Sequence, residues 1–184
     1  MTELQEALAW TDIPLPEELN NLQPFEQKSM ASYVREVVNR ETEGFEELFH
    51  AIGMIVKYIP HFIVIPLMVE HIKPRIAAGV CRKMGVDQAT GYANDLPLEY
   101  FSEVSRHLEH ELVAELLGKM KKNHAVQFIH YELQHHLAHM LDISEHLEPR
   151  ILEIVARQVT LPEHEDDLII HPHRMIIKKI RSMQ

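Results

Sequence analysis

Apolar residues recur every 24 positions between Ile52 and about residue 158, and this period constrains the fold more than any other feature of the chain. Written in rows of 24, the sequence aligns four columns of small or apolar residues: Val56, Val80, Val104, Phe128 and Leu152; Ile65, Ala89, Val113 and Leu137; Met68, Tyr92, Leu116 and Met140; and Val69, Ala93, Leu117 and Leu141. A fixed period between about 20 and 50 residues is the signature of a stacked structural repeat. The sequence therefore predicts a stack of similar units.

Each row divides into two short helices. Pro60 and Gly85 lie at or beside the turn inside a row, and Pro74, Pro97 and Asn123 mark the turns between rows. Helices this short are marginal alone, so each pair must bury its apolar side against the next pair. The chain has only six glycines, which leaves few hairpin turns. We expect an all-α fold, built as a right-handed superhelical repeat of short helix pairs.

The period also predicts how the chain is organised. Residues 1–51 form an N-terminal helical cap, residues 52–158 form the repeat array, and residues 159–184 form an acidic linker and a basic amphipathic C-terminal helix. In "RMIIKKIRSMQ" the cations fall on one helical face. This helix could fold back onto the acidic chain, or it could contact an acidic partner or a membrane surface.

The run "AIGMIVKYIPHFIVIPLMV", residues 51–69, has the length of a membrane span. Lys57 and His61 lie near its middle, and Pro60 and Pro66 would interrupt the backbone hydrogen bonds at bilayer depth. We therefore interpret the run as the first row of the repeat and expect no integral membrane segment.

The net charge and the cysteine content limit which partners and which cellular compartment are expected for the chain. The formal net charge of -10 disfavours nucleic acid as a partner. Cys81 is the only cysteine and lies among apolar residues, so plain packing is the expected role of its thiol. The start "MTELQEALAW" has neither a basic region nor an apolar core of the secretory type. We expect a cytoplasmic protein.

The segments "IPHFI", "IAAGVCRKMG", "ANDLPLEYFSEVSRHLEHELVAELL" and "FIHYELQHHLAHMLD" resemble the α-helical superhelix of the intracellular N domain of MgtE-type magnesium transporters. The middle domain of the flagellar motor switch protein is similar more loosely. The resemblance covers about residues 52–158 and implies a stand-alone MgtE-N-like helical protein, since no convincing transmembrane segments and no paired nucleotide-sensing domains follow.

The stretch "FIHYELQHHLAHML" suggests a divalent-metal site. His135 and His139 have the i, i+4 spacing that lets two side chains share an ion such as Zn²⁺, and Glu132 lies one turn earlier. The 24-residue period would add Glu111 and Glu115 from the neighbouring helix. On one continuous helix, however, Glu132 and His139 stand about 10 Å apart along the axis, so these two and His135 cannot hold one ion. The alternative is a solvated polar face, opposite a buried side that carries Leu133, Leu137, Met140 and Leu141.

Two further metal hypotheses rest on spacing alone. Glu47 and His50, with Glu132 and His135, form two Glu-x-x-His pairs of the kind found in di-iron four-helix bundles, but the prolines at 60, 66, 74 and 97 make the helices too short for such a bundle. His171 and His173 in "HPH" form a second candidate pair.

No phosphate-binding loop, cysteine pair or nucleophile elbow is present in the sequence. We therefore expect a non-enzymatic helical-repeat scaffold or regulatory protein without a cofactor, which binds another protein. Val80, Val104, Phe128 and Leu152 would form its spine, and Glu111, Glu115, His135 and His139 its contact surface. A divalent-metal-responsive regulator is the first alternative, and a di-iron carboxylate oxidoreductase is the second. Association with a second copy of the chain stays open.

Overall fold

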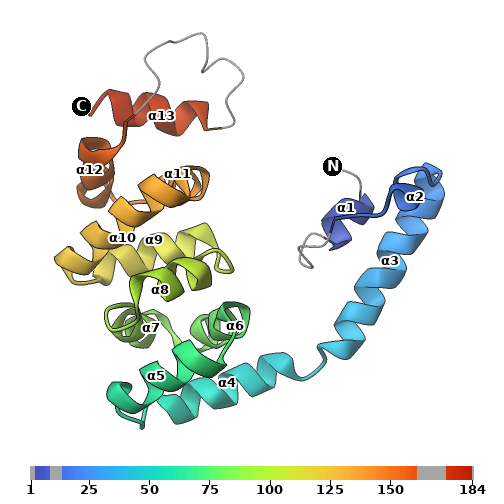
Figure 1. The fold of residues 1–184 in the computed structure, drawn as a ribbon, viewed down its shortest axis with the longest axis horizontal. Helices are drawn as coiled ribbons and strands as arrows, with labels where there is room; N and C mark the ends of the chain where they lie inside the picture. The colour runs from blue at the N-terminus through green and yellow to red at the C-terminus, as the bar shows by residue number, and fades with distance from the viewer. Residues whose placement is uncertain (1–2, 9–13, 161–172, 184) are drawn as a thin grey trace. The chain divides into compact units, whose positions relative to one another are not determined.

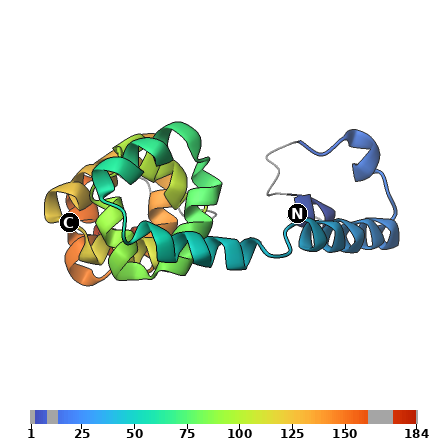
Figure 2. The ribbon, with the colours of Figure 1, turned by 90° about the horizontal axis from the view of Figure 1, so that it is seen from below.

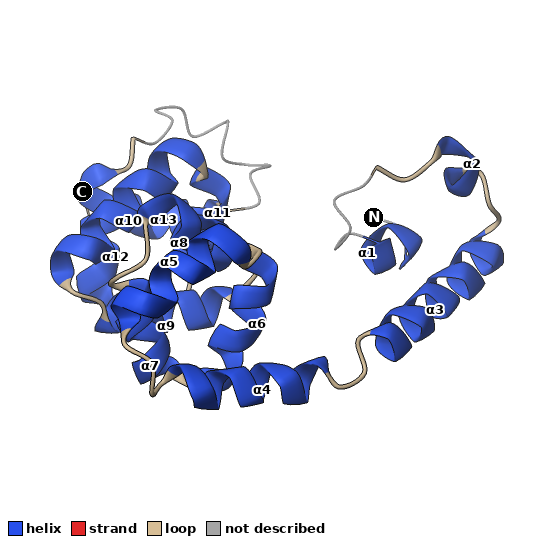
Figure 3. Ribbon diagram, turned by 60° about the horizontal axis from the view of Figure 1, so that its bottom comes forward, coloured by secondary structure: helices blue, strands red, loops and turns tan. Residues whose placement is uncertain are grey.

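The computed structural model describes residues 3–8, 14–160 and 173–183, and within these ranges it contains thirteen helices and no strand (Figure 3). The all-α prediction is confirmed for this part of the chain. The chain divides into two compact units, Met1–Leu48 and Phe49–Gln184, and each is described by itself.

The first unit is small. It contains α1 (Glu3–Leu8), α2 (Glu17–Asn20) and α3 (Pro24–Glu41). Leu4 and Ala7 of α1 pack against Ala31 of α3, and these three side chains are buried. A capping box fixes the start of α3: the backbone N–H of Gln23 donates to Oε2 of Glu26 at 2.8 Å. Gly44, with φ of +84°, follows the end of α3 in a conformation that glycine adopts without strain.

The second unit contains the remaining helices (Figure 1). It takes in α4 (Phe45–Val56) from Phe49 onward, followed by α5 (His61–His71), α6 (Pro74–Met84), α7 (Val86–Ala93), α8 (Leu98–Ser105), α9 (His110–Lys119), α10 (Lys122–His135), α11 (Leu137–Ser144), α12 (Pro149–Gln158) and α13 (Arg174–Arg181). The division at residue 48 lies three residues before the end of the predicted cap, and both positions fall within α4.

From α6 onward the helices form two files. In one file α6 contacts α8, α8 contacts α10 and α10 contacts α12; in the other α7 contacts α9, α9 contacts α11 and α11 contacts α13 (Figure 1). Each helix therefore packs against the helix two places before it. This arrangement explains how helices of only 8 to 14 residues remain stable: their apolar faces are covered from both sides along the file.

The spacing of the helices changes near residue 136. The helices α6, α8 and α10 begin at Pro74, Leu98 and Lys122, in steps of 24 residues, whereas α12 begins at Pro149, 27 residues after α10. The same change separates α9, which begins at His110, from α11, which begins at Leu137. The three additional residues lie in α10, which is 14 residues long.

This extension corrects the predicted buried side of α11. Leu137 is the first residue of α11 and is 40% exposed, whereas Met140 takes the position that Val113 has in α9, the fourth residue of the helix, and is fully buried. The predicted column that paired Val113 with Leu137 was wrong because it assumed a constant period. Leu141 is buried as predicted.

The core of the second unit runs along both files from α6 to α13. All four predicted spine residues, Val80, Val104, Phe128 and Leu152, are buried. The rings of Phe101 on α8 and Phe128 on α10 lie 4.9 Å apart between centroids. Burial raises the pKa of the Cys81 thiol on α6 to about 11, in agreement with the predicted packing role.

The C-terminal helix α13 covers the end of the stack (Figure 1). It contacts α11 and α12 and buries Ile176, Ile177 and Ile180, while Met175 is 78% exposed. The basic helix therefore folds back onto its own unit. The acidic linker predicted before it lies largely outside the described residues.

The apolar run 51–69 is divided between α4 and α5, with a turn at residues 57–60. Within the described residues no helix combines the length and the apolar character that crossing a membrane requires, which confirms the prediction for this run.

Candidate functional site

The histidine-rich stretch contains a helix break. The first helix, α10, ends at His135, and His136 takes a non-helical conformation, with φ of −142° and ψ of 52°. The second, α11, begins at the next residue, without a loop. The backbone N–H of His136 donates to the carbonyl of Glu132, and that of Met140 donates to the carbonyl of His136, so the last turn of α10 and the first turn of α11 share one residue.

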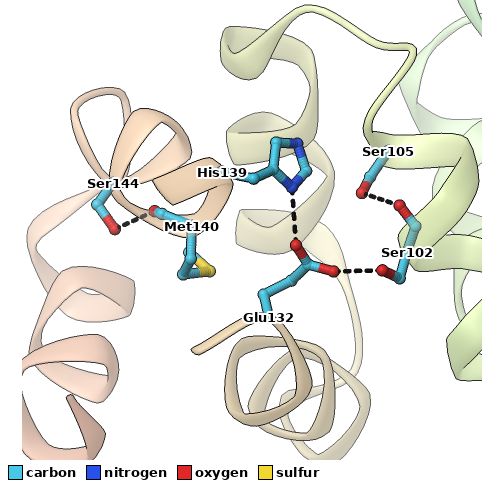
Figure 4. A network of polar contacts seen from close by, with 6 residues as sticks. All are labelled: Ser102, Ser105, Glu132, His139, Met140 and Ser144. Carbon is cyan, nitrogen blue, oxygen red and sulfur yellow. Dashed lines mark hydrogen bonds and ion pairs between the residues drawn. The ribbon is translucent and has the colours of Figure 1, made fainter. Parts of the chain in front are cut away.

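The break turns His139 back toward Glu132, and a buried polar cluster forms between α8, α10 and α11 (Figure 4). Glu132 is fully buried. Its Oε1 accepts a hydrogen bond from the Ser102 hydroxyl of α8, and its Oε2 lies 2.7 Å from Nδ1 of His139. A buried carboxylate without such partners would be strongly destabilising, so Ser102 and His139 compensate its desolvation.

The remaining hydrogen bonds around Glu132 position these partners. The Ser105 hydroxyl donates to the Ser102 carbonyl at 2.7 Å, and the Ser144 hydroxyl donates to the Met140 carbonyl at 2.7 Å (Figure 4). The ring of His110 on α9 meets the ring of His139 edge to face, with centroids 5.6 Å apart. Nε2 of His139 is buried and has no hydrogen-bond partner among the described residues. The cluster joins α8, α10 and α11 through side chains that the core encloses.

This geometry corrects the picture of a single helix with Glu132, His135 and His139 on a solvated face. Glu132 is buried, His139 is only 13% exposed, and the carboxylate and the imidazole are in direct contact, because the chain bends at His136. His135 remains exposed at the end of α10, where its ring lies 4.5 Å from that of Tyr131.

The structure does not bring the five predicted metal ligands together. Oε1 of Glu111 lies 3.6 Å from Nε2 of His146, two residues after α11, and Glu115 pairs with Lys119, four residues later on α9, at 3.7 Å. Within the ranges that the structure describes, no group of three or more histidine, cysteine or acidic side chains is arranged to hold a metal ion.

The other two metal hypotheses concern the two Glu-x-x-His pairs and the pair His171 and His173. Glu47 and His50 are exposed on α4, whereas Glu132 is enclosed in its own cluster. Nδ1 of His173, just before α13, lies 3.3 Å from Oδ1 of Asp142 on α11. His171 lies outside the described residues.

A second feature is the α4–α5 surface, which we define by the exposed apolar side chains of residues 54–72. They are Met54, Ile55, Tyr58, Phe62, Ile63, Leu67, Val69 and Ile72. Both Tyr58 and Phe62 are 79% exposed. Helix α4 buries only Gly53, and α5 buries only Val64. Exposed apolar side chains in this number are typical of an interaction surface.

The inner sides of these two helices are nevertheless anchored to the stack. The Tyr92 hydroxyl of α7 donates to the carbonyl of Val56 at 3.0 Å, and the Tyr100 hydroxyl of α8 donates to the carbonyl of Ile72 at 2.7 Å. Both bonds satisfy carbonyls at helix ends. The ring of His61 stacks on Tyr92 with centroids 4.2 Å apart. The helices are thus held in place, while their apolar side chains named above remain exposed. Figure 2 shows the ribbon of α4 and α5 from below.

The α4–α5 surface was not among the predicted site residues. The repeat interpretation treated residues 51–69 as an ordinary first row, buried like the others, with the preceding helices as a cap. The available signal was the composition of α5. Eight consecutive residues, "FIVIPLMV", are apolar, so this part of the helix has no polar face to turn toward solvent.

No known family model matches the chain, and no curated protein or solved structure is significantly similar to it.

Proposed function

We propose that this chain is a non-enzymatic helical-repeat scaffold that binds another protein through the α4–α5 surface. The observation that carries the proposal is the exposure of large apolar side chains, above all Tyr58 and Phe62, on two helices that are each hydrogen-bonded to the stack at the C-terminal end. Exposed aromatic side chains on a rigid support are favourable anchors, because they contribute large contact area and little ordering entropy on binding.

The finer architecture belongs to the same proposal. The two files from α6 to α13, in which each helix packs on the helix two before it, support a right-handed superhelix of helix pairs, the form that the resemblance to the MgtE N domain implies. Such stacks present extended surfaces to protein partners. A cytoplasmic location is also part of the proposal and rests on the single, half-buried cysteine and the absence of cysteine pairs in the sequence.

In a competing proposal, the α4–α5 surface is covered by the N-terminal cap that the sequence predicts from residues 1–51. A stack needs some cover at each end, and α13 supplies it at the other end. The divalent-metal regulator and the di-iron oxidoreductase have weaker support, because the described residues gather no cluster of ligands for either.

The test is site-specific photo-cross-linking in the cells that produce the protein. Phe62 is replaced by p-benzoylphenylalanine, and Met175 of α13, which is equally exposed, receives the same probe as a matched control. We expect one discrete adduct with another protein from position 62 only, and its loss when Leu67→Asp is added. Cross-links from position 62 to residues 1–51 of the chain itself would favour the cap. Identical adducts from both positions would contradict the proposal.

A further inference from the structure

A cavity of about 370 Å³ lies where the end of α9 and the start of α10 meet α12, far along the files from the α4–α5 surface. This volume falls within the range of pockets that hold small molecules, roughly 300 to 1,000 Å³. The cavity does not overlap the Glu132 cluster, because the two share no residue.

The inner part of the cavity is apolar. Leu117 at the end of α9 and Ile151 on α12 are buried, and Met120, which follows α9, is nearly so. Ala125 of α10 is small enough to leave space beside them, and Ile154 forms part of the wall. These side chains would favour an aliphatic group over water.

The rim carries three cations, Lys122, Arg150 and Arg157, and one carboxylate, Glu153, so its net charge is positive. Lys122 is the first residue of α10, and Arg150 is the second residue of α12, so both lie at the positive ends of their helices. Nη2 of Arg150 donates to the carbonyl of Gly118 at 3.4 Å, a bond that uses one of the five guanidinium N–H donors. Arg157 is paired with Glu153 at 3.6 Å, so Lys122 and Arg150 are the cations best placed to bind an anion.

We infer that this cavity binds an amphipathic carboxylate, with the carboxylate at Lys122 and Arg150 and an aliphatic chain against Leu117, Met120 and Ile151. An arginine binds a carboxylate through two parallel N–H bonds, a geometry that a neutral alcohol cannot match. A cationic rim on a chain with a net charge of -10 is a local departure from the overall charge, which would attract an anion to this position. The inference is independent of the proposed scaffold function.

The experiment is a titration of the full chain by calorimetry and by amide NMR spectra, with three probes of eight carbon atoms each: octanoate, octanol and octylamine. We expect saturable binding of one octanoate, with amide shifts centred on Met120, Lys122 and Ile151. Octanol should bind at least tenfold more weakly, and octylamine should not bind. High salt should weaken octanoate selectively, because its carboxylate interaction is screened.

Variants separate the rim from the inner part. Lys122→Gln/Arg150→Gln should weaken octanoate at least tenfold and leave octanol unchanged, and Ile154→Trp should fill the cavity and abolish binding of both. Lys57→Gln, at the end of α4, removes a cation elsewhere and should change neither. The inference is overturned if octanoate does not saturate, if octanol binds as tightly as octanoate, or if the double variant binds octanoate like the unmodified chain.

Discussion

The first helices of the second unit are more apolar than the helices in its middle and yet are far less buried. Helix α5 has eight consecutive apolar residues and buries one of them, whereas α8, with the more polar sequence "LEYFSEVS", buries Phe101, Ser102, Val104 and Ser105. The difference lies in the neighbours: α8 is packed between α6 and α10, while α5 begins the stack. In a stacked fold, position along the stack determines burial more than hydropathy does.

The same contrast applies to charge. Glu132, in the middle of the stack, is fully buried and hydrogen-bonded, whereas Glu111 and Glu115 of the neighbouring α9 are exposed and lie 3.6 Å from His146 and 3.7 Å from Lys119. An exposed pair contributes little to stability, because water and salt screen it and two long side chains must be ordered. A buried carboxylate with fixed partners is destabilising as soon as one partner is lost.

The largest difference is expected between Phe128→Ala and Phe62→Ala, two identical substitutions in the two regions. Phe128 is fully buried against Phe101, so its truncation should lower the free energy of unfolding by about 3–5 kcal/mol. Phe62 is 79% exposed, so its truncation should change the free energy of unfolding by no more than about 0.5 kcal/mol. Urea denaturation followed by circular dichroism measures both. Equal losses would mean that α5 is as deeply buried in solution as α10.

Glu132→Ala should have the next largest effect. The substitution leaves the Ser102 hydroxyl and Nδ1 of His139 without their acceptor and opens space between α8, α10 and α11, and we expect a loss of about 3 kcal/mol. Glu132→Gln keeps an acceptor for Ser102 and should lose less. Glu115→Ala removes a carboxylate in an exposed pair and serves as the matched control, with a change of about 0.5 kcal/mol or less. Comparable losses in Glu132→Ala and Glu115→Ala would argue against the buried cluster.

The apolar period predicted much of this core because it records which residues face the neighbouring helix. Val80, Val104 and Phe128 are each the seventh residue of their helices and are buried as predicted. Leu152 is buried too, although the shift of three residues makes it the fourth residue of α12. The constant period failed at Leu137 because α10 is three residues longer than the spacing allows, and neither proline nor glycine marks the break at His136. A non-helical histidine inside a helical pattern leaves no signal of its own in a single sequence.

The candidate sites were harder to predict for related reasons. The burial of Glu132 depends on Ser102, thirty residues earlier on another helix, and on a bend that directs His139 back toward it. The run "FIVIPLMV" indicates an unusually apolar helix, but its exposure also depends on whether the same unit supplies a further helix to cover the first pair, and a local run of residues does not report that. Both features are set by contacts between distant parts of the chain, whereas periodicity reports only local patterns.

The smallest effect is expected at an exposed link between neighbouring helices of one file. Oδ1 of Asp87 on α7 lies 2.8 Å from Nζ of Lys119 on α9, and Lys119 holds the pKa of the Asp87 carboxyl below its ordinary value of 3.8. A carboxyl whose pKa is lowered by folding stabilises the native state above its unfolded pKa, and this contribution disappears as the pH falls through the folded value. Asp87→Asn should therefore be slightly less stable than the unmodified chain at neutral pH.

The difference between Asp87→Asn and the unmodified chain should vanish in acid, where Asp87 is protonated in both states, and it should shrink at high salt, because Asp87 is 92% exposed. Paired urea titrations at neutral and acidic pH, each at low and high salt, measure it. Lys119→Met removes this link together with the Glu115 pair, so its loss of stability should be at least as large at neutral pH and should also diminish in acid. A large difference that persists in acid would mean that Asp87 contributes through packing rather than charge, and the distinction between exposed and buried charge drawn from Glu132 would then not extend to this file.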